Sequence, residues 1–140
     1  MKRTDLLLKI ITAAEGEPVT PVQLQKIAFL VRMEFPDELP ADYYRFQPYD
    51  YGPFCVTVYR DAEQLEREGL VTIRVNPRGG WKEYMASYTA AQKDLSVVPH
   101  HIQDFIDAKV KWAREVGFQE LVRTIYVEFP QFKINSVFQA

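Results

Sequence analysis

Apolar residues recur at helical spacing in the first part of the chain and predict two amphipathic helices there. The first helix is expected over residues 4–14, with Thr4 as its N-cap and Gly16 ending it. The second begins after Thr20, whose hydroxyl can accept a bond from a free helical N–H. Pro21 suits its first position, because the missing N–H has no partner there anyway, and Pro36 ends it. Its apolar face consists of Leu24, Ile27, Ala28 and Val31.

A third helix followed by a β-hairpin is predicted in the middle of the chain. The helix is expected over residues 53–68, with Gly69 ending it. Its apolar positions are Cys55, Val58, Tyr59, Ala62 and Leu65. Residues 70–75 then alternate, residues 76–80 contain proline and two glycines, and residues 81–88 return with β-favouring side chains. Three helices followed by a hairpin are the order of a winged helix, with the hairpin as its wing.

Two further amphipathic helices are predicted at the C-terminal end. They are expected over residues 99–116 and 118–129, with Gly117 separating them. Their apolar faces could pack on the body of the protein or form the seam of a homodimer, and the pattern fits both. We therefore expect an α+β, mostly helical, winged-helix-like single domain over residues 1–140. Residues 1–90 would form its winged-helix core and residues 91–140 a C-terminal helical extension.

Composition narrows the class of protein. The 140 residues are 47% hydrophobic, and 17 Lys and Arg against 19 Asp and Glu leave a net charge of −2. That balance gives no general attraction to a polyanion, so nucleic-acid binding would need a local basic patch. No apolar run reaches the roughly 18 to 20 residues of a membrane span, and no signal peptide is visible. Together with a single cysteine, this favours a cytoplasmic protein without a membrane partner.

Three segments carry a family resemblance. They are Leu24-Gln25-Lys26-Ile27-Ala28-Phe29-Leu30, Tyr44-Arg45-Phe46-Gln47-Pro48-Tyr49-Asp50-Tyr51-Gly52-Pro53-Phe54, and Leu65-Glu66-Arg67-Glu68-Gly69-Leu70-Val71. Residues 20–73 thereby resemble the YwgA-like family of small winged-helix proteins, and at a greater distance they are similar to the Panacea, or SocA-like, antitoxin domain. Panacea-like domains bind and neutralise unrelated toxins. The resemblance therefore implies a non-catalytic protein-binding module, as an antitoxin or an accessory component of a toxin or phage-defence system.

Six Tyr or Phe residues fall within residues 43–54, which is the most unusual local feature of the sequence. One interpretation is structural, with the rings packed into the junction between the second and third helices. The other is a partner-binding surface, because Tyr and Arg are enriched at binding hot spots. Its candidate residues are Arg45, Tyr49, Tyr51 and Phe54. This second interpretation fails if Tyr49, Tyr51 and Phe54 are fully buried.

The alternative function is a DNA-binding transcriptional regulator that acts as a dimer through the third helix and the wing. Its candidate contacts are Thr57, Arg60, Gln64, Arg74, Arg78 and Lys82. Four carboxylates on or next to the same helix, those of Asp61, Glu63, Glu66 and Glu68, would repel phosphates. The alternative therefore requires a contiguous positive face that outweighs them.

Groups for catalysis or metal binding are scarce. His100 and His101 are adjacent, so on a helix they point about 100° apart and cannot chelate one metal. Cys55 has no base near it in the sequence, and Gly79-Gly80 lies in a hairpin turn and not in a phosphate-binding loop. We therefore expect no enzyme, no cofactor, no catalytic residue and no metal site.

Overall fold

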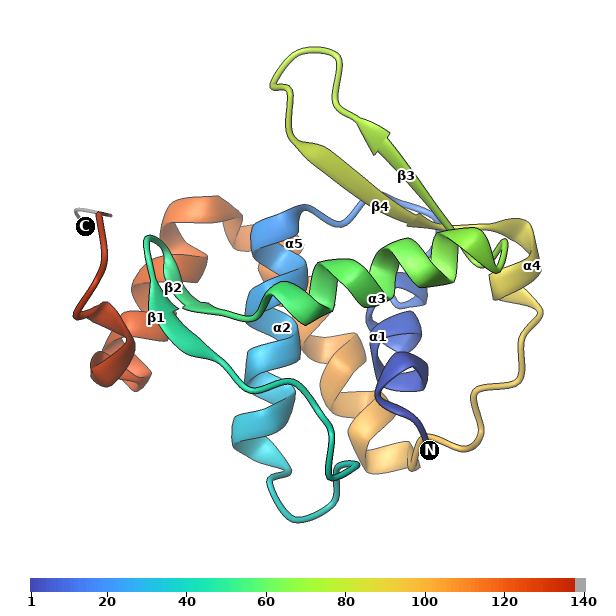
Figure 1. The fold of residues 1–140 in the computed structure, drawn as a ribbon, viewed down its shortest axis with the longest axis horizontal. Helices are drawn as coiled ribbons and strands as arrows, with labels where there is room; N and C mark the ends of the chain where they lie inside the picture. Colours follow the sequence, from blue (N-terminus) through green and yellow to red (C-terminus); the bar gives the residue numbers. More distant parts are fainter. Residues whose placement is uncertain (138–140) are drawn as a thin grey trace.

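The computed structural model describes residues 1–137, which form an α+β fold made mostly of helices, with two small antiparallel hairpins (Figure 1). The helices are α1 (Arg3–Thr12), α2 (Pro21–Glu34), α3 (Val56–Arg67), α4 (Tyr88–Ala91), α5 (His100–Glu128) and the 3-10 helix η1 (Pro130–Lys133). The strands are β1 (Gln47–Tyr49), β2 (Gly52–Phe54), β3 (Val71–Val75) and β4 (Lys82–Ala86).

Helix α2 lies at the centre of the core. All eight of its residues from Leu24 to Val31 are buried, so the helix is covered on every side. It packs against α5, which passes behind it in Figure 1, and against α1, α3 and β2. Its start is as the sequence predicts, because the Thr20 hydroxyl accepts from the Gln23 N–H and the Gln23 side chain accepts from the Thr20 N–H.

Helix α1 begins earlier than expected. Thr4 is not its N-cap, since the helix starts at Arg3 with Lys2 in the cap position. The Asp5 carboxylate accepts the Lys2 backbone N–H at 2.7 Å and so satisfies one free donor of the first turn. The prediction missed this because a side chain from inside the helix does the capping, and a lysine at the cap is a weak signal.

The aromatic segment forms a hairpin that the sequence did not predict. Strands β1 and β2 pair antiparallel, with Gln47 opposite Phe54 and Tyr49 opposite Gly52. Helix α3 therefore starts at Val56 and not at residue 53, and Cys55 is its N-cap residue instead of a residue of its apolar face. Each of these strands has three residues and contains a proline, so it is too short for an alternation of apolar and polar residues to be recognised in the sequence.

The second hairpin follows α3 as expected, with its return strand ending at Ala86 and not at residue 88. Ser87 then caps the short helix α4 by accepting the Ala90 N–H, and this helix was not predicted. A third extended segment joins the hairpin at its other edge. The backbones of Val19 and Tyr84 exchange two hydrogen bonds of 2.9 Å, which ties the linker between α1 and α2 to β4.

Helix α5 contains the two predicted C-terminal helices as one element with a bend. Gly117, at φ 79° and ψ 178°, interrupts the helical conformation at the expected position. The apolar face is buried within the chain against α2, η1 and α1. Its buried residues are Ile102, Ile106, Val110, Ala113, Leu121, Val122, Ile125 and Tyr126. Packing on the body of the protein is therefore the outcome, and a homodimer would have to use another surface.

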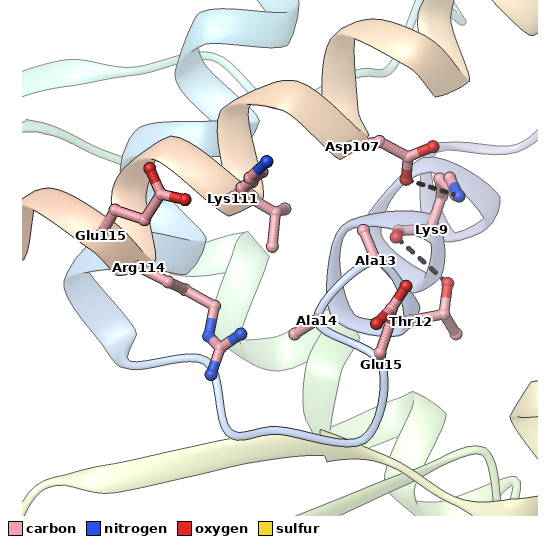
Figure 2. A pocket seen from close by; sticks show the side chains of 10 residues that line it. Lys9, Thr12, Ala13, Ala14, Glu15, Asp107, Lys111, Arg114 and Glu115 are labelled. Atoms are coloured by element: carbon pink, nitrogen blue, oxygen red, sulfur yellow. Dashed lines mark hydrogen bonds and ion pairs between the residues drawn. The ribbon is translucent and has the colours of Figure 1, made fainter.

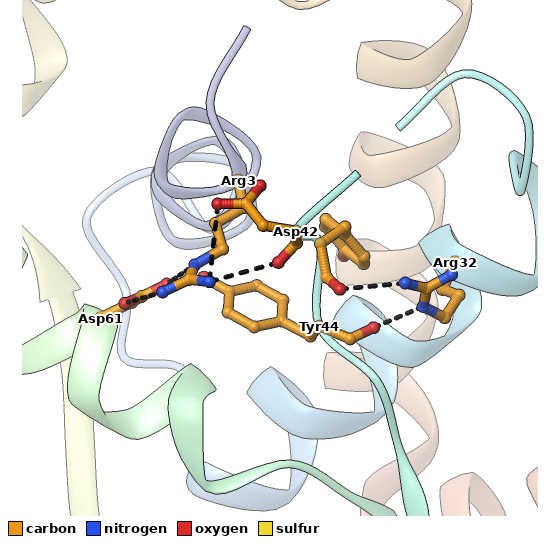
Figure 3. Close-up of polar contacts among 6 residues, drawn as sticks. Arg3, Arg32, Asp42, Tyr44 and Asp61 are labelled. Carbon is orange, nitrogen blue, oxygen red and sulfur yellow. Dashed lines mark hydrogen bonds and ion pairs between the residues drawn. The ribbon is translucent and has the colours of Figure 1, made fainter. Parts of the chain in front are cut away.

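A polar network ties the N-terminus of α1 to α3 and to the chain that enters β1 (Figure 3). The Arg3 guanidinium donates to both Asp61 carboxylate oxygens, at 2.7 and 3.2 Å, and the Tyr44 hydroxyl donates to Asp61 at 2.6 Å. Arg32 of α2 donates to the carbonyls of Tyr43 and Tyr44. Because Asp61 is only 9% exposed, these donors replace the water that its carboxylate loses on burial.

We predict that Asp61→Ala lowers the free energy of unfolding by roughly 2 to 4 kcal/mol, because it removes the acceptor of the buried Tyr44 hydroxyl and leaves the Arg3 guanidinium with its contacts to the exposed Asp42. Urea unfolding measures the change. The control is Glu120→Ala, which removes an exposed ion pair with Arg123 and should cost less than about 1 kcal/mol. Equal losses in the two variants would contradict a stabilising role for the network.

Candidate functional site

A row of four aromatic rings in mutual contact crosses four elements of the fold. Tyr49 of β1 stacks on Phe54 of β2 with ring centroids 5.0 Å apart, and Phe54 meets the edge of Tyr59 of α3 at 5.7 Å. Tyr59 stacks on Tyr84 of β4 at 6.2 Å. We call these four residues the aromatic row. It links the β1–β2 hairpin to the β3–β4 hairpin across the start of α3.

The row is buried at one end and exposed at the other. Tyr84 is 2% exposed, whereas Tyr49 is 54% exposed, and the neighbouring Tyr51, whose ring contacts Phe118, is 43% exposed. Phe54 and Tyr59 are half-buried. The exposed end therefore presents two tyrosines whose rings are already held by neighbouring rings.

The other rings of the aromatic segment belong to the core. Tyr43 and Tyr44 are almost fully buried, and the Tyr43 hydroxyl donates to the Ala28 carbonyl at 2.7 Å. Phe46 packs edge-on against the buried Phe29. The structural interpretation therefore holds for Tyr43, Tyr44 and Phe46, whereas Tyr49 and Tyr51 are exposed, as the partner-binding interpretation requires.

Beside the exposed end lies a small hollow of about 170 Å³ between α2 and the β1–β2 hairpin. It is lined by Val22, Gln25, Lys26, Tyr49, Asp50, Tyr51, Gly52, Phe54 and Tyr59. We call it the Lys26 hollow. Three of the four candidate partner-binding residues, Tyr49, Tyr51 and Phe54, contribute to its walls.

Lys26 is the most unusual group of this hollow. It is 3% exposed, and its Nζ donates to the Pro53 carbonyl at 3.0 Å. The ion pairs found within residues 1–137 do not include it. Burial lowers the pKa of the Lys26 ammonium to about 8, because removing water penalises its charged form. Within residues 1–137, the Lys26 ammonium is therefore a buried cation with a backbone carbonyl as its acceptor and no carboxylate partner.

Sequence reasoning missed Lys26, because a lysine inside a helix is usually solvated. One signal was present in the sequence. Residues 27–31 are apolar without interruption, and such a run is typical of a helix that is covered on all sides. On such a helix a neighbouring lysine has no exposed face to occupy.

Gln25 fixes the backbone next to this hollow. Its side-chain amide donates to the Cys55 carbonyl at 2.8 Å and accepts the Cys55 N–H at 2.9 Å. These two bonds hold the junction between β2 and α3 against α2. Cys55 is half-buried at this junction and its side chain packs against the core, while its backbone makes both bonds to Gln25.

Arg45 lies apart from the three aromatic candidates. It lines a different hollow of about 270 Å³, together with Arg3, Asp42 and Thr57. Thr57, a candidate for DNA contact, is half-buried in the same place. The expected grouping of Arg45 with Tyr49 and Tyr51 is therefore not observed.

The remaining candidates for DNA contact are dispersed. Arg60 and Lys82 line a common hollow between α3 and β4, but Glu63 lines it too. Arg74 pairs with Glu83 at 2.9 Å across the hairpin. Gln64 is exposed and bonds within its own helix to Arg67 and Glu68. Arg78 lies in the hairpin turn, where its backbone N–H donates to the Asn76 side chain.

Another hollow, of about 760 Å³, lies between α1 and α5 (Figure 2). Lys9 pairs there with Asp107 at 2.9 Å, while Arg114, Lys111 and Glu115 follow along α5. Three basic and three acidic side chains line this hollow, so their formal charges cancel.

Metal-binding groups are absent from residues 1–137, where no three His, Cys, Asp or Glu side chains lie close enough to hold an ion. His101 bonds instead to Glu38, at 2.6 Å on the surface. Among the described helices, none is long and apolar enough to cross a membrane.

Comparisons of the chain with models of known families, with curated proteins and with solved structures found no match.

The buried Lys26 predicts that stability increases with pH between about 8 and 10. The pKa of Lys26 is about 8 in the folded protein and 10.5 for an ordinary lysine, so the unfolded chain binds more protons in this range. The free energy of unfolding should rise by about 1 to 2 kcal/mol from pH 7.5 to 9.5. It should fall again above pH 10, since burial raises the pKa of Tyr43, Tyr44 and Tyr84.

Urea unfolding at pH 7.5, 8.5 and 9.5 measures this rise. Lys26→Met should flatten the profile, and Lys82→Met, at an exposed lysine, should leave it unchanged. A profile of the same slope in the unmodified protein and in Lys26→Met would show that Lys26 is solvated.

Proposed function

We propose that the protein is a non-catalytic protein-binding module of the winged-helix type, and that it binds its partner through the exposed end of the aromatic row. The observation that supports this is the pairing of two exposed tyrosines, Tyr49 and Tyr51, with rings that hold them in place. Large aromatic side chains that lose little conformational freedom on binding are typical anchors of protein interfaces.

Two features support the winged-helix assignment. The β3–β4 hairpin follows α3 directly, as a wing follows the third helix. Val19, between α1 and α2, pairs with Tyr84 of β4 and extends the hairpin at its edge. The β1–β2 hairpin inserted between α2 and α3 is then the addition that carries the proposed interface.

The nature of the partner is inferred from the resemblance of residues 20–73 to YwgA-like proteins and, more distantly, to Panacea antitoxin domains. On that basis the partner is a cytoplasmic toxin or a component of a phage-defence system. The surface is consistent with this role, because the exposed rings lie on a hairpin where side chains can change without disturbing the core.

A second candidate function, DNA binding by a dimer, has one observation in its favour. Arg60 and Lys82 line the same hollow between α3 and the wing. The pairing of Arg74 with Glu83 and the presence of Glu63 reduce the positive charge available nearby. We therefore place protein binding first.

Affinity capture from the native lysate, with and without nuclease and at two salt concentrations, separates the two functions. A stoichiometric protein that survives both treatments supports the module, and a discrete DNA fragment that is lost as salt rises supports the regulator.

The purified partner then allows a test by substitution. We expect Tyr49→Ala with Tyr51→Ala to raise the dissociation constant by at least tenfold, because each truncated anchor costs about 1 to 2 kcal/mol. Isothermal titration calorimetry measures it. Tyr88→Ala is the control, since Tyr88 is an exposed tyrosine on α4, outside the row. An unchanged dissociation constant in the double variant would overturn the proposed surface.

A further inference from the structure

We propose that the Lys26 hollow is a specificity pocket that takes a glutamate side chain of the partner, with the carboxylate bound by the Lys26 ammonium. This inference rests on the proposed function and names the chemistry that the site recognises.

The Lys26 ammonium has N–H donors that are available to a ligand. It carries three N–H groups, and within residues 1–137 one of them is used, by the Pro53 carbonyl at 3.0 Å. A buried ammonium without a counter-ion is destabilising, and a carboxylate that reaches it gains both charge and hydrogen bonds. Charge complementarity thus selects an acidic group.

Beside the hollow, the backbone of β2 packs closely against side chains of α2 and α5. Gly52 of β2 has φ +100°, and a Cβ atom there would lie 3.2 Å from the Tyr126 ring and 3.7 Å from Lys26 Cε. Only glycine permits this conformation together with such a close approach. The backbone of β2 therefore lies directly against the stem of the lysine.

The volume of the hollow and the charge of Lys26 favour a ligand that has one carboxylate on a short apolar chain. The volume of about 170 Å³ is smaller than that of the usual pocket for a small molecule and suits a single side chain. Tyr49, Tyr51 and Phe54 can pack against methylene groups. Asp50 also lines the hollow, from the exposed turn of the hairpin, and its negative charge disfavours a doubly charged phosphate more than a carboxylate.

Small probes test the pocket without the partner. Butyrate has the shape of a glutamate side chain, and butyramide is its neutral isostere. Each is titrated into the full ¹⁵N-labelled chain at pH 6.5 and constant ionic strength, and amide shifts are followed by NMR. We expect saturable shifts at Lys26, Gly52 and Phe54, with butyrate binding at least about tenfold tighter than butyramide.

Three variants make the result specific. Lys26→Met should abolish the preference for butyrate, Lys82→Met should retain it, and Tyr49→Ala should weaken both probes equally. At pH 9.5, where Lys26 is mostly neutral, the preference should also be lost. Equal binding of the two probes, a preference that survives Lys26→Met, or shifts confined to other regions would each overturn the proposal.

The outcomes separate this inference from the proposed function. A partner that depends on Tyr49 and Tyr51, with no discrimination between the probes, overturns the pocket and leaves the module intact. Discrimination between the probes with no partner dependent on these tyrosines supports the pocket and overturns the proposed interface.

Discussion

The enclosure of α2 is the constraint on which the rest of the structure depends. A helix that is buried on all sides needs a neighbour over each face, and here α1, α3, α5 and β2 supply those neighbours. The polar residues of its central part must then find partners in the protein. Gln25 bonds to the Cys55 backbone and Lys26 to the Pro53 carbonyl, so the same two residues that burial forces inward also position the β1–β2 hairpin.

The aromatic segment divides because its two ends are held differently. Arg32 donates hydrogen bonds to the carbonyls of Tyr43 and Tyr44, and Asp61 accepts one from the Tyr44 hydroxyl. These bonds fix the first two rings in the core. Beyond them the chain turns outward into β1, and the tip of the hairpin is anchored by the Val137 N–H and the Ser136 hydroxyl, which donate to the Asp50 carbonyl. The rings at this tip are therefore rigidly supported but remain exposed.

Local sequence patterns were sufficient to predict most of the helices and the β3–β4 hairpin. The positions of α2, β3 and the bend at Gly117 follow from capping residues, alternation and a glycine with positive φ. The β1–β2 hairpin and the burial of Lys26 were not predictable in the same way, because each depends on the other. Strand β2 is held against α2 by the bond from Lys26 to the Pro53 carbonyl, and Lys26 is in turn buried because Gly52 and Pro53 lie over it. Tyr49 and Tyr51 were chosen as candidates from the aromatic composition of their segment, and their exposure and the separation of Arg45 from them required the three-dimensional path of the chain.

Several basic side chains are paired with carboxylates of neighbouring elements. Arg3 and Arg74 are used within the fold, by Asp61 and Glu83, and Lys9 is paired with Asp107 across α1 and α5. Pairs of this kind hold elements together and leave little net field outside the protein. Lys26 is different, because its charge is buried with a carbonyl as its acceptor. The buried Lys26 ammonium can attract a partner's carboxylate only when the two groups are in contact. It would therefore add selectivity to the proposed interface, whose affinity comes from the tyrosines.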